Sequence, residues 1–228
     1  MNHMRQFFLK LGLTASMLLW ASIAVTHANA APIAFNFTGT VTDVGAQLGT
    51  TTFSTGQTVQ GSYTFEPSTS NTGSGFTGTY NGALNGPSTN LNVTIGTYVA
   101  SLASGANTIE VKNPSSLSAD SYHVAGSFSG SAVNPPDPKS FALDLVKPSS
   151  NQFNGVLLPT TPPSVSSFAT RTFRLVFGNG GASRTVVITL DTLTAVPLPA
   201  AVILFGAGLV ALVGLGAGSW RQRKNSLA

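Results

Sequence analysis

The feature of the chain that most restricts its fold is a two-residue alternation of apolar and polar side chains, which recurs along residues 31–195. Each run places its apolar residues on one face, as a β-strand with one buried face requires. Clusters of Gly, Asn, Ser and Pro separate the runs, and no long helical period interrupts them. About eight runs are recognised, at residues 35–41, 59–65, 93–99, 109–111, 122–128, 141–145, 173–177 and 186–190.

These runs predict an all-β fold, a single domain of the β-sandwich or jelly-roll type, over residues 31–195. The Gly-Asn-Gly-Gly run at 178–181 predicts a hairpin that pairs residues 171–177 with residues 185–191. The proline-rich segments 134–138 and 148–167 are predicted to be loops, because proline cannot donate to a central strand ladder.

The charges of the chain lie mostly at its two ends. The formal net charge is +4, but between residues 31 and 195 six Lys and Arg residues face seven Asp and Glu residues. This near-neutral body has no basic stripe, which argues against a nucleic-acid partner. The chain contains no cysteine, which excludes disulfides and thiolate metal sites.

Residues 1–30 are predicted to be a secretory signal peptide. Arg5 and Lys10 supply the positive start, residues 11–25 the apolar run, and Ala28 and Ala30 a small-x-small cleavage site. Export through the inner membrane and cleavage before residue 31 follow from this pattern.

Residues 198–218 form an uncharged segment of 21 residues, and a helix of that length spans about 31 Å, close to the thickness of the bilayer core. We therefore predict one C-terminal transmembrane helix. Arg221, Arg223 and Lys224 lie in the basic tail 219–228, and the positive-inside rule places that tail in the cytoplasm and the body outside.

The terminal segment 196–228 combines a short proline motif, an apolar helix and a basic tail. Its motif consists of Val196, Pro197, Leu198, Pro199 and Ala200. In this order the three parts resemble the PEP-CTERM sorting signals, in their Val-Pro-Leu-Pro-Ala variant. The resemblance implies processing by an exosortase, a surface or extracellular location with transient or stable membrane anchoring, and association with exopolysaccharide or biofilm.

A non-enzymatic surface or matrix protein is accordingly the leading hypothesis. A carbohydrate-binding module is the first alternative, because exposed Tyr63, Tyr80, Tyr98 or Tyr122 could stack on sugar rings. We expect each of these tyrosines to fill the core or its rim instead. A secreted hydrolase is the second alternative.

A hydrolase would need catalytic groups that converge in one cleft. Nothing in the spacing pairs Glu66 with Glu110, and both are expected to be solvated strand residues. Asp120 and His123 stand close enough in sequence to suggest part of a triad, but no Gly-x-Ser-x-Gly elbow accompanies them. An exposed polar role is the expected one for His123.

No cofactor is predicted. One histidine in the mature chain and no cysteine argue against zinc or copper. Calcium stays an open alternative, since oxygen ligands suffice for it, and Asp137 with Asn134, or Asp43, are the candidates.

Overall fold

The computed structural model describes residues 31–49, 51–86, 90–114, 119–133, 136–149 and 152–196. The predicted signal peptide 1–30, the motif residues Pro197 to Ala200, the predicted helix 198–218 and the basic tail 219–228 lie outside the described residues. No helix within the described ranges is long and apolar enough to cross a bilayer.

The described chain is all-β, as the alternation predicts. Two short 3-10 helices, η1 (Val165–Ser167) and η2 (Ala182–Arg184), accompany the strands. The strands are β1 (Ile33–Val44), β2 (Thr58–Phe65), β3 (Thr77–Asn81), β4 (Asn90–Ile95), β5 (Tyr98–Leu102), β6 (Thr108–Lys112), β7 (Asp120–Gly130), β8 (Pro138–Lys147), β9 (Thr170–Phe177) and β10 (Thr185–Ala195).

The strand pattern differs from the sequence prediction in three main places. β8 begins at Pro138, within the segment 134–138 that was predicted to be a loop. The single run expected at 93–99 is split, because Gly96 adopts a positive φ of 58° and turns the chain between β4 and β5. This turn places Val99 on the outer face, 53% exposed, whereas the run placed it with the apolar residues. Strand β3 was not predicted at all.

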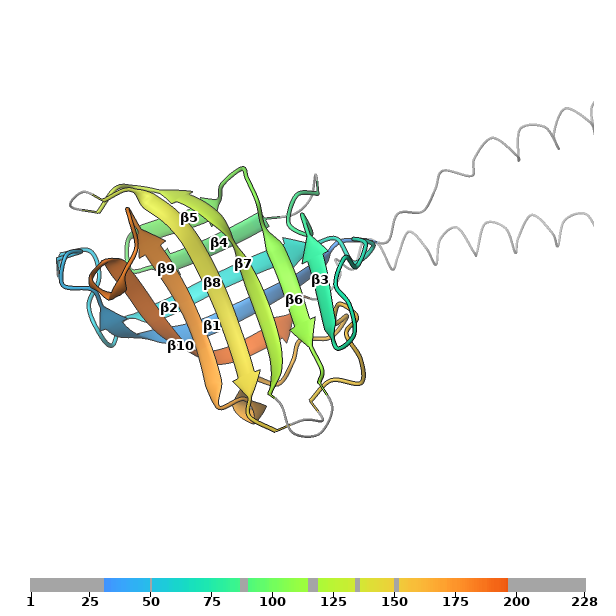
Figure 1. Cartoon of the computed structure of the whole chain (residues 1–228). Helices are drawn as coiled ribbons and strands as arrows, with labels where there is room; N and C mark the ends of the chain where they lie inside the picture. The colour runs from blue at the N-terminus through green and yellow to red at the C-terminus, as the bar shows by residue number, and fades with distance from the viewer. Residues whose placement is uncertain are drawn as a thin grey trace, which may run out of the picture.

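Eight of the strands close into one antiparallel barrel. Leaving β3 and β6 aside, each strand pairs with the next one along the chain, and β10 pairs with β1 to complete the ring. This up-and-down order differs from the Greek key of a jelly roll, and the hydrogen-bonded closure differs from the expected sandwich of two sheets. Figure 1 shows the barrel flattened into two layers whose strands cross steeply, with β9, β8, β7, β6 and β3 in one layer and β4, β2, β1 and β10 in the other.

Strands β3 and β6 extend one layer beyond the ring. The first half of β7 pairs with β6, and the last residues of β7 pair with β5. β3 pairs with the other edge of β6. The outer edge of β3 is covered locally: Thr79 donates its N–H to Asn71 Oδ1 at 2.9 Å, and its carbonyl accepts the N–H of Thr72 at 2.8 Å. This covering removes the unpaired edge that would invite another strand.

The interior of the barrel is filled by side chains. The Phe35 ring lies edge-on to Tyr63 and Phe65, with ring centroids 5.7 and 5.5 Å apart, and further aromatic pairs line the core. An eight-stranded barrel is just wide enough for such filling. Burying each large apolar side chain stabilises the fold by about 1.5–3 kcal/mol, so this core explains how a chain without disulfides remains folded.

The two ends of the body lie side by side. Phe35 faces Ala195 in the β1–β10 register, and Val196 donates its N–H to the Ala34 carbonyl at 2.9 Å. The closed ring and its buried cluster are therefore complete within residues 31–196. This part of the chain meets the requirements of an independent folding unit.

Candidate functional site

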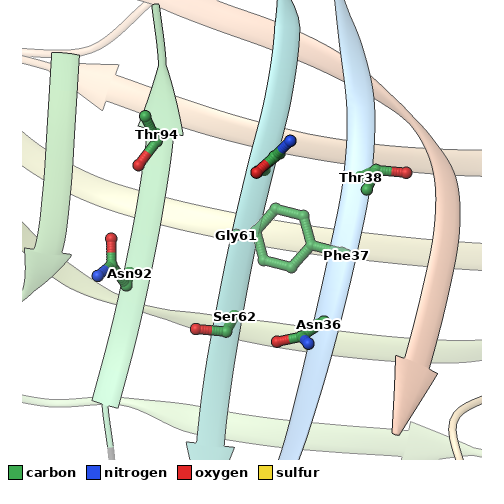
Figure 2. Close-up of a pocket in the computed structure, with 8 residues that line it drawn as sticks. Asn36, Phe37, Thr38, Gly61, Ser62, Asn92 and Thr94 are labelled. Atoms are coloured by element: carbon green, nitrogen blue, oxygen red, sulfur yellow. The ribbon is translucent and has the colours of Figure 1, made fainter. Parts of the chain in front are cut away.

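The outer face of β1, β2 and β4 carries a shallow, open depression of about 490 Å³. Six of its side chains are polar and uncharged, and we call them the amide-hydroxyl surface. They are Asn36 and Thr38 from β1, Gln60 and Ser62 from β2, and Asn92 and Thr94 from β4. Figure 2 shows these side chains on three adjacent strands.

The alternation of each strand positions these residues. Because successive side chains point to opposite faces, Phe37 and Val93 enter the core while their neighbours face outward. Gly61 lies opposite Phe37 in the register, and a Cβ built on it would lie 2.2 Å from Phe37 Cζ. The absence of a side chain at Gly61 lets the Phe37 ring pack across β2 directly beneath the depression (Figure 2).

The register arranges the polar residues in two rows that run across the strands. In the first row Asn36, Ser62 and Asn92 are direct cross-strand neighbours, and the row extends to Thr194 on β10 and Ser101 on β5. The second row consists of Thr192, Thr38, Gln60, Thr94 and Val99. Each row therefore crosses five strands.

Among the described residues, side-chain hydrogen bonds are made at one end of each row, and none is made in the middle. Thr38 and Thr192 share a hydroxyl hydrogen bond of 2.7 Å, and Ser101 and Ser129 share one of 3.1 Å. Within the described chain, the side chains in the middle make no hydrogen bond; these are Asn36, Gln60, Ser62, Asn92 and Thr94. Their donors and acceptors are free to meet water or a ligand.

Charge is segregated between the two layers. β2, β4 and β5 carry no charged residue, while β1 and β10 carry one each, Asp43 and Asp191. The other layer holds most of the charges in its strands, which are Glu110, Lys112, Asp120, His123, Lys139, Asp144, Lys147, Arg171 and Arg174. The amide-hydroxyl surface is therefore almost free of nearby charge.

A small ionic cluster lies on the charged layer. His123 Nδ1 is 2.6 Å from Asp144 Oδ1, and Arg174 contacts the other oxygen of the same carboxylate at 2.5 Å. Burial raises the pKa of Asp144, but the hydrogen bonds and charges of His123 and Arg174 outweigh burial and hold that pKa below its usual value. Asp144 is the partner of His123 that the sequence did not identify.

The structure does not bring Asp120 and His123 together. They stand three residues apart in β7, so Asp120 points into the interior, fully buried, while His123 lies on the outer face. Asp120 Oδ2 accepts the N–H groups of Gln152 and Phe153 at 2.7 and 3.4 Å. The arrangement imagined for a hydrolase triad with these two residues is therefore wrong.

The glutamates are also separate. Glu110 lies in β6 and forms an ion pair of 2.8 Å with Lys112, whereas Glu66 follows the end of β2. Neither an ion pair nor a hydrogen bond joins the two in the described part of the chain, so they form no paired-carboxylate site there.

All four tyrosines are buried. Tyr63, Tyr80, Tyr98 and Tyr122 are each at most 4% exposed, as expected for core residues. Burial raises the pKa of Tyr98 to about 12 and that of Tyr122 further. A sugar-stacking platform built from these tyrosines is therefore excluded, and the carbohydrate-binding alternative loses the residues on which it depended.

The calcium candidates are dispersed. Asn134 lies outside the described residues, Asp137 precedes β8, and Asp43 lies near the end of β1. No group of three or more His, Asp or Glu side chains gathers at one point in the ranges that the structure describes. The calcium alternative stays untested.

The comparisons with known proteins give no relative. Neither a family model, nor a curated protein, nor a solved structure matches the chain. The functional argument therefore depends on the residues themselves.

Proposed function

We propose that this protein is an exported cell-surface or extracellular-matrix protein, sorted by an exosortase-type enzyme, and that its barrel acts by binding and display without catalysis. The observation that carries the proposal is the sorting-signal pattern in residues 196–228, together with the signal-peptide pattern in residues 1–30. The proposal includes association with exopolysaccharide or biofilm.

The position of the motif relative to the barrel supports this proposal. β10 ends at Ala195, and Val196, the first motif residue, is 38% exposed. A cut beyond Val196 would leave all ten strands and the core intact. The export and sorting signals would then flank a complete domain and remove nothing from it.

The arrangement of titratable groups supports a non-catalytic role. The candidate acid Asp120 is buried in the barrel interior. The half-buried His123 on the outer face is paired with Asp144, whose other carboxylate oxygen contacts Arg174. His123, Glu66 and Glu110 do not converge with a nucleophile through any hydrogen bond in the described residues.

The experiment is C-terminal mass spectrometry of the protein extracted from the surface of the producing cell. We expect the mature chain to begin at residue 31 and to end near Val196. Abundant peptides from residues 219–228 in the surface fraction would contradict the proposed processing.

A matched pair of variants sharpens the experiment. Substituting Pro197→Ala with Pro199→Ala should leave unprocessed protein in the membrane fraction, because proline disfavours a continuing helix and alanine permits one, and the proposed cleavage needs an extended segment. Substituting Asn154→Ala, in an exposed loop of the body, should leave processing unchanged.

A further inference from the structure

The amide-hydroxyl surface has the chemistry of a binding site for a neutral polar ligand. Asn36, Gln60 and Asn92 each present an amide that both donates and accepts, and Ser62 and Thr94 present hydroxyls that do the same. A partner that satisfies such groups must also offer donors and acceptors together. Hydroxyl groups meet this requirement, whereas phosphate and sulfate offer acceptors alone.

The absence of nearby charge further restricts the class of ligand that this surface could bind. An anionic polymer gains affinity from Lys and Arg side chains, and β2, β4 and β5 carry none. The few charged residues at the margins of this layer, Asp43 and Asp191, would repel an anion. Nucleic acid and acidic polysaccharide are thus disfavoured, and an uncharged ligand pays no electrostatic penalty.

The shape of the surface favours a polymer over a small molecule. Sites for small molecules enclose most of the ligand, but this depression is shallow and open. The polar groups lie on a lattice of about 4.8 Å between strands and about 6.8 Å between alternate residues of one strand. A chain that repeats its hydroxyl groups every few ångströms can contact several lattice points at once.

The free hydrogen-bonding groups in the middle of the rows are the observation that carries the assignment. At one end of each row a side chain hydrogen-bonds its cross-strand neighbour: Thr38 bonds Thr192, and Ser101 bonds Ser129 of β7. The five central side chains have no hydrogen-bond partner in the described chain. A ligand that replaces their water molecules costs no internal hydrogen bond.

We propose that the amide-hydroxyl surface binds an uncharged polysaccharide chain along the outside of β1, β2 and β4. Val99, 53% exposed and next to Thr94 in the register, supplies an apolar contact for the C–H groups of a sugar ring. Without an exposed tyrosine, each sugar is held weakly, and affinity grows with the number of sugars in contact. This inference rests on the proposed surface location and adds the ligand class and its site.

The test uses the purified body, residues 31–196, which contains the whole barrel and its core. The probes are the uncharged and the anionic fractions of the exopolysaccharide of the producing cell, separated by anion exchange. We expect saturable retardation in native gels that contain the uncharged fraction, with no change between low and high salt.

The variant Asn36→Ala with Asn92→Ala removes two amides from the middle of the first row, and we expect its affinity to fall at least tenfold. The matched control is Asn154→Ala, which removes an exposed amide from a loop outside the surface and should bind as the wild type does. Thermal unfolding of all three proteins shows whether the barrel is retained.

Four outcomes would overturn the inference. The first three are binding to neither fraction, salt-dependent binding to the anionic fraction, and wild-type binding by the double variant. The fourth is a dimer that the double variant abolishes, which would assign the surface to self-association. None of these outcomes affects the C-terminal mass spectrum, so sorting can be correct even when the assigned ligand is wrong.

Discussion

The hydroxyl groups of Tyr63 and Tyr122 are hydrogen-bonded to each other at 3.0 Å inside the barrel, where each tyrosine is at most 1% exposed. Tyr63 comes from β2 and Tyr122 from β7, so the hydrogen bond joins the two layers through the core. Each hydroxyl is the polar partner that the other requires in an apolar interior.

Removing one of these hydroxyls should therefore cost more than removing both. Tyr63→Phe leaves the Tyr122 hydroxyl buried without a partner, and we expect the free energy of unfolding to fall by about 1–3 kcal/mol. Tyr63→Phe with Tyr122→Phe should recover most of that loss. Urea unfolding of the wild type, Tyr63→Phe, Tyr122→Phe and the double variant measures both values, and additive losses would show that the hydroxyls do not depend on each other.

Tyr98, unlike Tyr63 and Tyr122, has a buried hydroxyl without a hydrogen-bond partner among the described residues. Tyr98→Phe removes an unsatisfied polar atom while keeping the ring that packs against Phe53, 4.9 Å away between centroids. We expect this variant to be more stable by about 1 kcal/mol in urea unfolding, and a loss of stability would show that the hydroxyl is solvated.

The same residue makes the barrel sensitive to alkali. Burial raises the pKa of Tyr98 to about 12, above its usual value near 10. Below pH 10 the titration of Tyr98 does not lower the free energy of unfolding, because the tyrosine is then neutral in both the folded and the unfolded state. The free energy of unfolding then falls as the pH rises from 10 toward 12, because the unfolded chain releases the proton more readily than the folded one. Stability curves measured against pH should be less steep in this range for Tyr98→Phe than for the wild type.

Gly61 is predicted to be intolerant of any side chain. A Cβ at this position would overlap the Phe37 ring, so Gly61→Ala should lower the free energy of unfolding by about 1–3 kcal/mol. Phe37→Leu removes the ring and should restore part of the loss in the double variant. If Gly61→Ala unfolds at the wild-type urea concentration, the Phe37 ring does not pack over Gly61.

The ion pairs of Asp144 should make the stability of the barrel depend on pH in the acid range. The pKa of Asp144 lies below the usual value, so its stabilisation is present above about pH 4 and is lost as the pH falls through the lowered pKa. Asp144→Asn should lower stability at neutral pH by about 1–2 kcal/mol and should flatten the acid part of the curve. Ser166→Ala, in an exposed part of η1, is the control that should leave the acid part unchanged.

The alternation of apolar and polar residues predicted most of the strands, because a strand with one buried face needs an apolar side chain at every second residue. It could not predict which strands pair, and the closing pair, β1 with β10, joins the two ends of the body. The turn at Gly96 was missed because Ile95 and Tyr98 on either side of it are both apolar and buried. The inward-facing positions shift from odd to even residues there, and the sequence does not show this shift. β3 was missed because Tyr80 is its single large inward residue and Gly78 replaces the other.

The candidate site was harder to predict than the fold. Asn36, Gln60 and Asn92 occupy the polar half of ordinary alternating runs, and only the register shows that they are neighbours. The separation of Asp120 from His123 could have been predicted, because an odd spacing in a strand places two residues on opposite faces. The pairing of His123 with Asp144 needed the β7–β8 register.

The hydrogen bond from Val196 to the Ala34 carbonyl continues the ladder between β1 and β10 to the point where the chain leaves the barrel, and this ladder would carry a load applied at the C-terminus. If the barrel is tethered through its C-terminus, tension enters along β10, which β1 holds over nearly its whole length and β9 over its first half. Tension along the axis of a strand shears these hydrogen bonds together, whereas tension across the axis would peel them apart one by one. If the C-terminus is tethered and a ligand holds the outer face, the pulling force would act along β10. In that direction the hydrogen bonds of β10 to its neighbours resist together.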